Sequence, residues 1–187
     1  MTDLIPMTAL GGAAPRSRRH GALSLVERPD IALASLALRR GAVAPAPGGL
    51  VLPGPGGLAS ADGLAAFWTG PGQWMVEAAG QAEADFAAAL AAMAPGCSVT
   101  EQTDGWACFE VAGDAAALEA LAERLVNLPA AALAPGRATR TVLHHMGVFA
   151  LRRDPGCLAL WGMRSAAGSL WHALDQAALR LTAFDET

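Results

Sequence analysis

The stretch Val99–Val111, which reads V-T-E-Q-T-D-G-W-A-C-F-E-V, decides the fold class of this chain. Its second half alternates with the period of a strand, so that one face carries Trp106, Cys108 and Glu110. Asp104-Gly105 is a tight-turn dipeptide, because Gly accepts a positive φ and Asp can hydrogen-bond to its own backbone. We therefore expect a hairpin with strands over 98–102 and 106–111, followed by a helix from Gly113-Asp114.

Strand-turn-strand patterns recur on both sides of this stretch. A strand is predicted over 31–40, and a second hairpin is predicted around Gly70-Pro71-Gly72, with one tryptophan in each arm. A third turn, Asp154-Pro155-Gly156, separates strand-like residues 139–152 from a strand over 157–161. The sequence is therefore rich in short antiparallel pairs.

Three amphipathic stretches predict helices that cover these strands. They span 82–94, 114–125, and a last helix with Ser165 as its N-cap and one apolar side made of Leu170, Leu174, Ala177 and Leu181. The resulting order is roughly β-ββ-α-ββ-α-ββ-α, which is typical of an α+β fold with antiparallel sheets covered by about three helices. A doubly wound parallel sheet fits this order poorly.

The length of 187 residues suits one domain with a sizeable core. Residues 1–22 contain Pro and Gly without a periodic pattern, and we predict a flexible N-terminal arm there. Residues 23–187 are predicted to form a single α+β domain. A Pro/Gly-rich loop interrupts that domain at about 41–63, because Pro cannot donate to a β-ladder.

Composition and charge exclude several classes of protein. The net charge of −4 argues against a nucleic-acid partner. No stretch approaches the roughly 20 apolar residues of a membrane span, and the N-terminus lacks the pattern of a signal peptide. The three widely spaced cysteines predict reduced, mostly buried thiols. We expect a cytoplasmic protein with no membrane and no nucleic-acid partner.

Few residues suggest chemistry of their own. The chain has no lysine, which excludes a P-loop, and it has no G-x-S-x-G motif. His144-His145 would project to opposite faces of a strand, so we predict no metal site. The candidates for contacting a ligand or an interface are Trp74, Glu101, Asp104, Trp106, Arg140 and Arg164. Each also has a structural interpretation: the tryptophans as core, Asp104 as a turn residue and Glu101 as a solvated strand residue.

Several short motifs follow one another in a specific order. They are Glu27-Arg28-Pro29, Trp68-Thr69-Gly70-Pro71-Gly72-Gln73-Trp74, Glu101-Gln102-Thr103-Asp104-Gly105-Trp106, Glu123-Arg124-Leu125, Ala138-Thr139-Arg140-Thr141, Arg164-Ser165 and Ser169-Leu170-Trp171. In this order the chain resembles the gamma subunit of the bacterial heterotetrameric sarcosine oxidases, from Glu27 to the last helix. Val126-Asn127 stands where members of that family often carry a Cys.

The resemblance implies a fold similar to the folate-binding domain of glycine-cleavage aminomethyltransferases. The heterotetrameric sarcosine oxidases oxidise sarcosine with oxygen to glycine, hydrogen peroxide, and formaldehyde or methylenetetrahydrofolate. The resemblance further implies that FAD, FMN, NAD and tetrahydrofolate belong to the alpha and beta subunits and zinc to the delta subunit, with no cofactor in this chain. We thus expect a non-catalytic subunit whose partners are the alpha, beta and delta chains.

Two alternatives remain open. The first is a free-standing, folate-dependent aminomethyltransferase-like protein, which needs a pterin pocket with a carboxylate from Asp104 or Glu101. The second is the equivalent subunit of an oxidase for another N-methyl amine, a choice that depends on the other chains.

Overall fold

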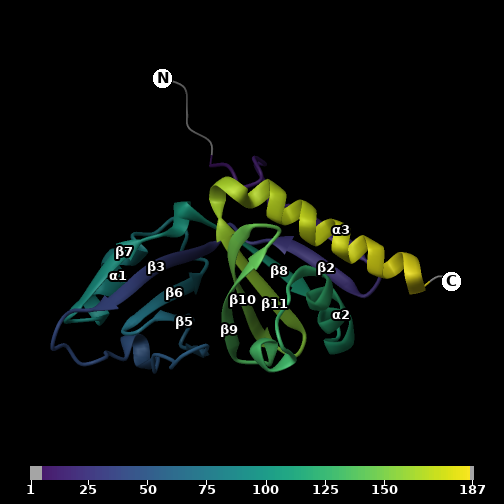
Figure 1. The fold of residues 1–187 in the computed structure, drawn as a ribbon. Helices are drawn as coiled ribbons and strands as arrows, with labels where there is room; N and C mark the ends of the chain where they lie inside the picture. The colour runs from purple at the N-terminus through teal and green to yellow at the C-terminus, as the bar shows by residue number, and fades with distance from the viewer. Residues whose placement is uncertain (1–5, 186–187) are drawn as a thin grey trace, which may run out of the picture.

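The computed structural model describes residues 6–185 and contains two antiparallel sheets and three α-helices. This confirms the predicted α+β class. The larger sheet, sheet A, has six strands in the order β1 (Ser17–His20), β2 (Leu23–Glu27), β8 (Trp106–Ala112), β11 (Cys157–Met163), β10 (Met146–Asp154) and β9 (Arg137–Leu143). Figure 1 shows sheet A in the middle and right of the view.

The smaller sheet, sheet B, is built from one continuous part of the chain. Its five strands lie in the order β4 (Leu58–Ala61), β5 (Leu64–Gly70), β6 (Gln73–Ala79), β3 (Ile31–Leu38) and β7 (Cys97–Glu101). The chain therefore leaves sheet A after β2, completes sheet B, and returns to sheet A at β8. Because β2 and β8 pair with each other, sheet B is an insertion between two neighbouring strands of sheet A.

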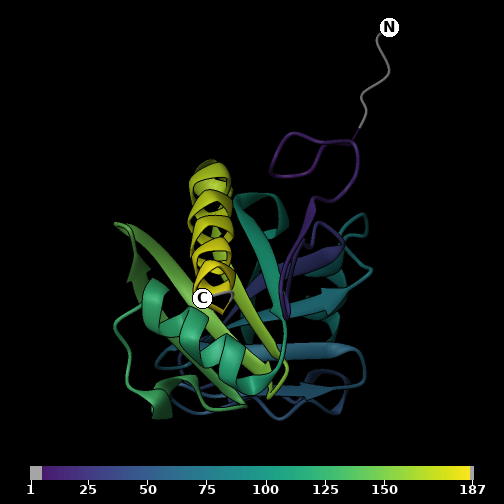
Figure 2. The ribbon, with the colours of Figure 1, turned by 90° about the vertical axis from the view of Figure 1, so that its right-hand side faces the viewer.

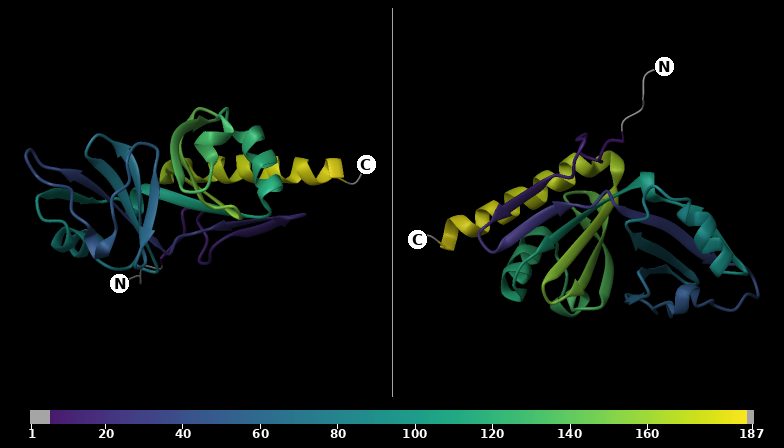
Figure 3. Two further views of the ribbon diagram at one scale, coloured as in Figure 1. Left: turned by 90° about the horizontal axis from the view of Figure 1, so that it is seen from below. Right: turned by 180° about the vertical axis from the view of Figure 1, so that it is seen from behind.

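The helices cover the outer faces of the two sheets, as Figures 2 and 3 show from other sides. Helix α1 (Phe86–Met93) packs on sheet B, whereas α2 (Ala115–Leu125) and α3 (Ala167–Asp185) lie on sheet A. A third apolar cluster lies between the sheets and joins residues of both, among them Leu33, Phe67, Phe149 and Trp161. The layers are thus helix, sheet, sheet, helix.

The predicted alternation of β8 is confirmed. Phe109 and Val111 pack in the core under α2 and α3, while Cys108 belongs to the cluster between the sheets. Both faces of β8 are therefore covered, as expected for a central strand with β2 on one side and β11 on the other.

The predicted hairpin around Asp104-Gly105 is wrong. β7 pairs with β3 in sheet B and β8 lies in sheet A, and the 3-10 turn Thr103–Gly105 carries the chain from one sheet to the other. A turn dipeptide reverses or redirects a chain equally well, so it could not distinguish a hairpin from a crossing.

The other turns agree better with the sequence. β5 and β6 form the hairpin around Gly70-Pro71-Gly72, with Trp68 opposite Trp74, and Asp154-Pro155-Gly156 joins β10 to β11. His144-His145 is a correction, because both residues form the turn between β9 and β10, with positive φ, and do not lie on a strand.

The ends of the predicted elements also change. Part of the stretch 1–22, which we predict as a flexible arm, forms the strand β1, because its backbone pairs with β2. Residues 1–5 lie outside the described part. Asp85 caps α1, so this helix begins later than predicted. Ser165 is not an N-cap, since it lies in a 3-10 turn that precedes α3. Within the described chain, no helix has the length and hydropathy to cross a bilayer.

Candidate functional site

A cleft of about 700 Å³ lies where the chain crosses between the two sheets. The two crossings run side by side, because Gln102 N donates to Leu33 O at 2.8 Å and Arg28 N donates to Cys108 O at 2.9 Å. Side chains from both crossings, and from the turn before α3, line the cleft; they include Glu27, Arg28, Thr103, Asp104, Trp106 and Arg164. Three of the six predicted site residues therefore meet here.

Asp104, Trp106 and Arg164 form one side of this cleft. The Asp104 carboxylate is fully exposed and lies 3.9 Å from Arg164 Nη1. Arg164 also donates from Nη2 to the carbonyl of Met7 at 2.8 Å, and Trp106 Nε1 donates to Gln102 Oε1 at 3.3 Å. The indole ring of Trp106 packs against the phenyl ring of Phe149, with 5.7 Å between the ring centroids. These groups form a polar rim around one partly buried tryptophan.

The other three predicted residues lie elsewhere. Trp74 is buried under α1 and donates from Nε1 to Pro53 O at 2.8 Å, so it belongs to the core of sheet B. Arg140, on the edge strand β9, lies over the Phe149 ring at 5.9 Å. Glu101 ends β7 outside the cleft lining.

Glu101 organises the turn that starts the crossing. Its Oε1 accepts hydrogen bonds from the Gln102 and Thr103 amides, both at 3.0 Å, and from the Thr103 hydroxyl. Its Oε2 accepts from Ala87 N at 3.2 Å, at the beginning of α1. Burial alone would raise the pKa of this carboxyl, but these hydrogen bonds stabilise the ionised form and lower the pKa overall.

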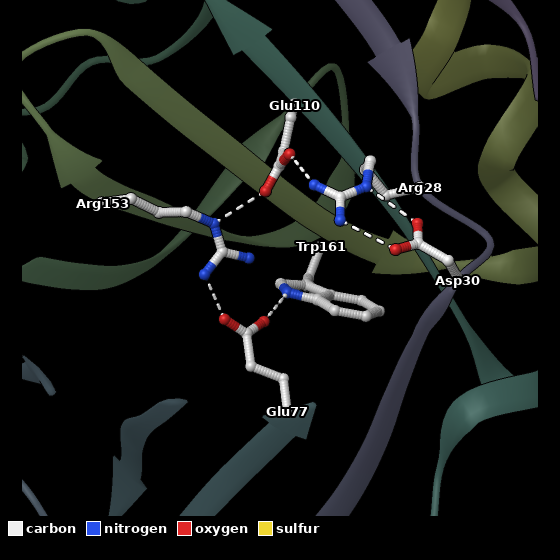
Figure 4. A network of polar contacts seen from close by, with 6 residues as sticks. All are labelled: Arg28, Asp30, Glu77, Glu110, Arg153 and Trp161. Atoms are coloured by element: carbon white, nitrogen blue, oxygen red, sulfur yellow. Dashed lines mark hydrogen bonds and ion pairs between the residues drawn. The ribbon is translucent and has the colours of Figure 1, made fainter. Parts of the chain in front are cut away.

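A second group of polar residues, absent from the sequence prediction, forms a network between the sheets (Figure 4). Glu77 of β6 is 3% exposed at its side chain; it pairs through Oε1 with Arg153 and accepts a 2.8 Å bond from Trp161 Nε1 through Oε2. Glu110 of β8 pairs with Arg28 and lies 2.9 Å from Arg153 Nε without a hydrogen bond.

Arg28 extends this network to the surface. Its Nε donates to Asp30 Oδ1 and its Nη2 donates to Asp30 Oδ2, both at 2.8 Å. Hydrogen bonding to Asp30 raises the pKa of Arg28, and the same bonds lower the pKa of Asp30. For Arg153, burial alone would lower the pKa, but the hydrogen bond and the charge of Glu77 raise it. The network therefore keeps both arginines charged and paired with carboxylates, although Arg153 Nε has no hydrogen-bond partner.

The cleft also receives the chain before β1. Buried Glu27 accepts from Leu10 N at 3.0 Å and from Arg16 N at 3.1 Å, which ties residues 10–16 over sheet A. Together with the bond from Arg164 to Met7, these contacts make this segment one wall of the cleft.

The environment of the cysteines disfavours thiol chemistry. Burial raises the pKa of all three thiols, that of Cys157 to about 11, so the nucleophilic thiolate is disfavoured. Within the described part of the chain, no group of three or more His, Cys, Asp or Glu side chains converges on a point where a metal ion could bind. The cleft carries a charged rim and the indole of Trp106.

The architecture is an α+β fold with two antiparallel sheets and three helices, and it is similar to that of two solved structures. The chain is similar to a chain in the heterotetrameric sarcosine oxidase from Corynebacterium sp. U-96 in complex with pyrrole 2-carboxylate, with 19% identity, a TM-score of 0.70 and 88% of each chain covered. It is also similar to glycine cleavage system aminomethyltransferase T from Bartonella henselae, with 18% identity and a TM-score of 0.57. That match covers 87% of this chain but 50% of the aminomethyltransferase, so this chain spans half of it.

These likenesses establish the fold. A scan of protein-family models and a search of curated proteins returned no match.

Proposed function

We propose that this chain is a non-catalytic subunit of a heterotetrameric oxidase of the sarcosine oxidase type, and that it acts by packing against the chains that carry the cofactors. The observation that carries this proposal is the length of the structural match. This chain and the chain of the heterotetrameric enzyme cover each other to 88%, whereas only half of the aminomethyltransferase is covered.

The state of the paired and buried carboxylates supports a role in packing. A general base needs a carboxylate that is free to take a proton near neutral pH. Glu77 and Glu110 are held by arginines, and Glu27 is held by backbone amides. The pKa of Asp30 is lowered by Arg28, away from neutrality.

The end of sheet A that carries Trp106, beside the cleft, supplies a surface for such packing. Met163 lies opposite Trp106 in the β8–β11 register and is 49% exposed, and exposed Val142 lies near the same end of sheet A, on β9. Arg140 and Arg164 flank these apolar groups. An aromatic residue among exposed apolar and arginine side chains is a common composition for the centre of a protein interface.

Co-expression with flavoprotein partners tests the proposal directly. We expect tagged chain to recover the flavin-containing subunits and their sarcosine-dependent peroxide production, while the isolated chain contains no FAD or FMN and shows no oxidase activity. Met163→Glu is expected to reduce recovery of the partners. Val51→Glu, a charge placed on a loop residue that is 76% exposed, is the matched control and is expected to leave recovery unchanged. Stoichiometric flavin on the isolated chain would contradict the proposal.

The substrate of the complex is a separate question with a separate measurement. Peroxide production by the assembled complex from sarcosine, dimethylglycine and other N-methyl amines distinguishes a sarcosine oxidase from an oxidase of another amine. We expect sarcosine to be preferred.

One observation favours a second function, a free-standing folate-dependent aminomethyltransferase-like protein: the cleft places the Asp104 carboxylate beside Trp106 and Arg164. Calorimetry with tetrahydrofolate tests this alternative. Tight binding by the isolated chain that disappears in Asp104→Ala would favour it over the subunit, and we expect no such binding.

A further inference from the structure

A second cavity, of about 750 Å³, lies on the helical side of sheet A, away from the cleft between the sheets. We call it the helix groove. Its walls come from the end of α2, from one side of α3 and from the turn between β9 and β10. The side chains that give it its character are Arg124, His144, Met146, His172, Gln176 and Arg180.

The groove runs along α3 because of the spacing of the residues there. Gly168, His172, Gln176 and Arg180 recur every four residues and lie on one stripe, since four residues make about one turn of an α-helix. The neighbouring positions carry small side chains, Ala173 and Ala177, which leave room for a ligand above the helix. At 1.5 Å per residue the stripe is about 18 Å long.

The groove has one sign of charge. Among the described residues that line it, the titratable groups are two arginines and two histidines, and none is an aspartate or a glutamate. This contrasts with the net charge of −4 for the whole chain. Concave surfaces lined by one sign of charge concentrate the opposite charge, so the groove favours an anionic occupant.

The backbone of the β9–β10 turn is the second observation. His144 and His145 have φ of 45° and 70°, in the left-handed region that Gly and Asn adopt more readily than His in a two-residue turn. The chain contains the favourable alternative at another two-residue turn, Asp62-Gly63, with φ of 53° and 79°. Strain of this kind is concentrated at binding sites, and here it places His144 at the rim of the groove.

We propose that the helix groove binds an extended acidic peptide segment of a partner chain. Its length matches about five residues of extended chain at roughly 3.3 Å each. Its cations would pair with carboxylates, and its apolar floor, which includes Leu125 and Met146, would receive aliphatic side chains of the same segment.

A nucleic acid fits the groove less well than a peptide. Sequence-independent binding of single strands depends on aromatic side chains on which bases stack, and no aromatic ring other than imidazole lines the described groove. The low content of basic residues, 13 in 187, points the same way.

Fluorescence anisotropy with the isolated full-length chain tests the proposal. The probe is a labelled six-residue peptide of alternating Glu and Leu, and the comparison probes are the same peptide with Gln for Glu and a labelled single-stranded oligonucleotide. We expect saturable binding of the acidic peptide alone, weakened by salt.

Matched variants locate the binding. Arg180→Gln and His172→Gln are each expected to weaken binding of the acidic peptide about tenfold, which is the effect of losing one charge-assisted hydrogen bond. Arg18→Gln removes an exposed cation from β1, outside the groove, and is expected to have no effect. Circular dichroism confirms that each variant is folded.

Three results would overturn the proposal: no saturable binding of the acidic peptide, an equal loss in Arg18→Gln, or an oligonucleotide that binds as tightly with the same dependence on Arg180. The identity of the partner chain rests on the proposed function, but the peptide measurement does not. If the chain binds the peptide but recovers no flavoprotein, only the proposed function is contradicted. If the chain recovers the flavoproteins but does not bind the peptide, only the proposal for the helix groove is contradicted.

Discussion

Glu77 shows how much a single residue contributes between the two sheets. Its carboxylate comes from sheet B, while both of its partners, Arg153 and Trp161, come from sheet A. A buried ion pair adds little net stability over an apolar pair of the same shape, but removing one partner leaves an uncompensated charge in a poorly hydrated site.

We therefore expect Glu77→Ala to lower the free energy of unfolding by about 3 kcal/mol, because Arg153 loses its main counter-charge. Urea unfolding followed by circular dichroism measures this change. Glu77→Gln, which keeps an acceptor for the Trp161 indole, is expected to cost less than Glu77→Ala. Glu119→Ala, at an exposed position of α2, is the control and is expected to have no measurable effect. A loss below about 1 kcal/mol for Glu77→Ala would show that water replaces the carboxylate.

Glu101 makes stability depend on pH in the acid range. Its pKa in the folded chain is lower than its ordinary value of 4.5, so the unfolded chain binds this proton more readily. The stabilising contribution is present at neutral pH and is lost as the pH falls through the range below 4.5.

We expect Glu101→Gln to reduce the loss of stability between pH 5 and pH 3, compared with the unsubstituted chain. Thr103→Val removes one hydrogen-bond donor to this carboxylate and is expected to reduce the loss in part. Urea unfolding at several pH values gives the slopes. Identical slopes in all three proteins would mean that other carboxylates carry the acid dependence.

The sequence predicts part of the candidate site at the level of single residues. Asp104, Trp106 and Arg164 were singled out and meet at one cleft, because their motifs frame the same crossing. The network of Glu77, Glu110 and Arg153 was missed, since its members lie on three strands far apart in the sequence. Glu110 alone gave a signal, as a charged residue on a predicted strand face shared with Trp106 and Cys108.

At the scale of elements, the turn between β9 and β10 is the clearest departure from local preference. A two-residue turn between antiparallel strands favours Asn-Gly, because both central residues need a positive φ. His144-His145 forms such a turn here, and because His is not a typical turn residue the sequence pattern predicts a strand where the structure has a hairpin.

We expect the double substitution His144→Asn and His145→Gly to raise the free energy of unfolding by about 1 kcal/mol, because the new residues accept the turn without strain. The same variant is expected to bind the acidic peptide more weakly than the parent chain. The reverse exchange at the β4–β5 turn, Asp62→His with Gly63→His, is expected to destabilise. Urea unfolding of both variants measures these effects, and a less stable Asn-Gly chain would contradict them.

Periodicity predicted most strands and helices because it reflects burial on one or two faces. It could not predict pairing, and β7 and β8 show why. Each has a proper strand pattern, yet each pairs with a strand 45 or more residues away in the sequence. β7 pairs with β3 and β8 pairs with β11, and neither partner is the nearest strand along the chain. The Asp104-Gly105 turn is compatible with both outcomes.

At the scale of the whole molecule, the two sheets share one apolar cluster and one polar network. Neither sheet keeps a covered inner face without the other. Stability is therefore expected to be a property of the pair.

We expect unfolding in urea to be a single transition, with coincident curves from tryptophan fluorescence and far-ultraviolet circular dichroism. Phe149→Ala, which removes a ring that contacts Phe67 of sheet B at 5.1 Å, is expected to shift both curves together by about 3 kcal/mol. Two separate transitions would show that sheet B unfolds on its own.

The insertion of sheet B between β2 and β8 has a consequence for protein engineering. Residues 31–101 leave and re-enter at neighbouring points, so this segment is a cassette with both ends at one place. Such a cassette can be exchanged for the corresponding part of a distant relative without changing the order of strands in the host sheet, provided that the donor supplies a carboxylate where Glu77 now meets Arg153.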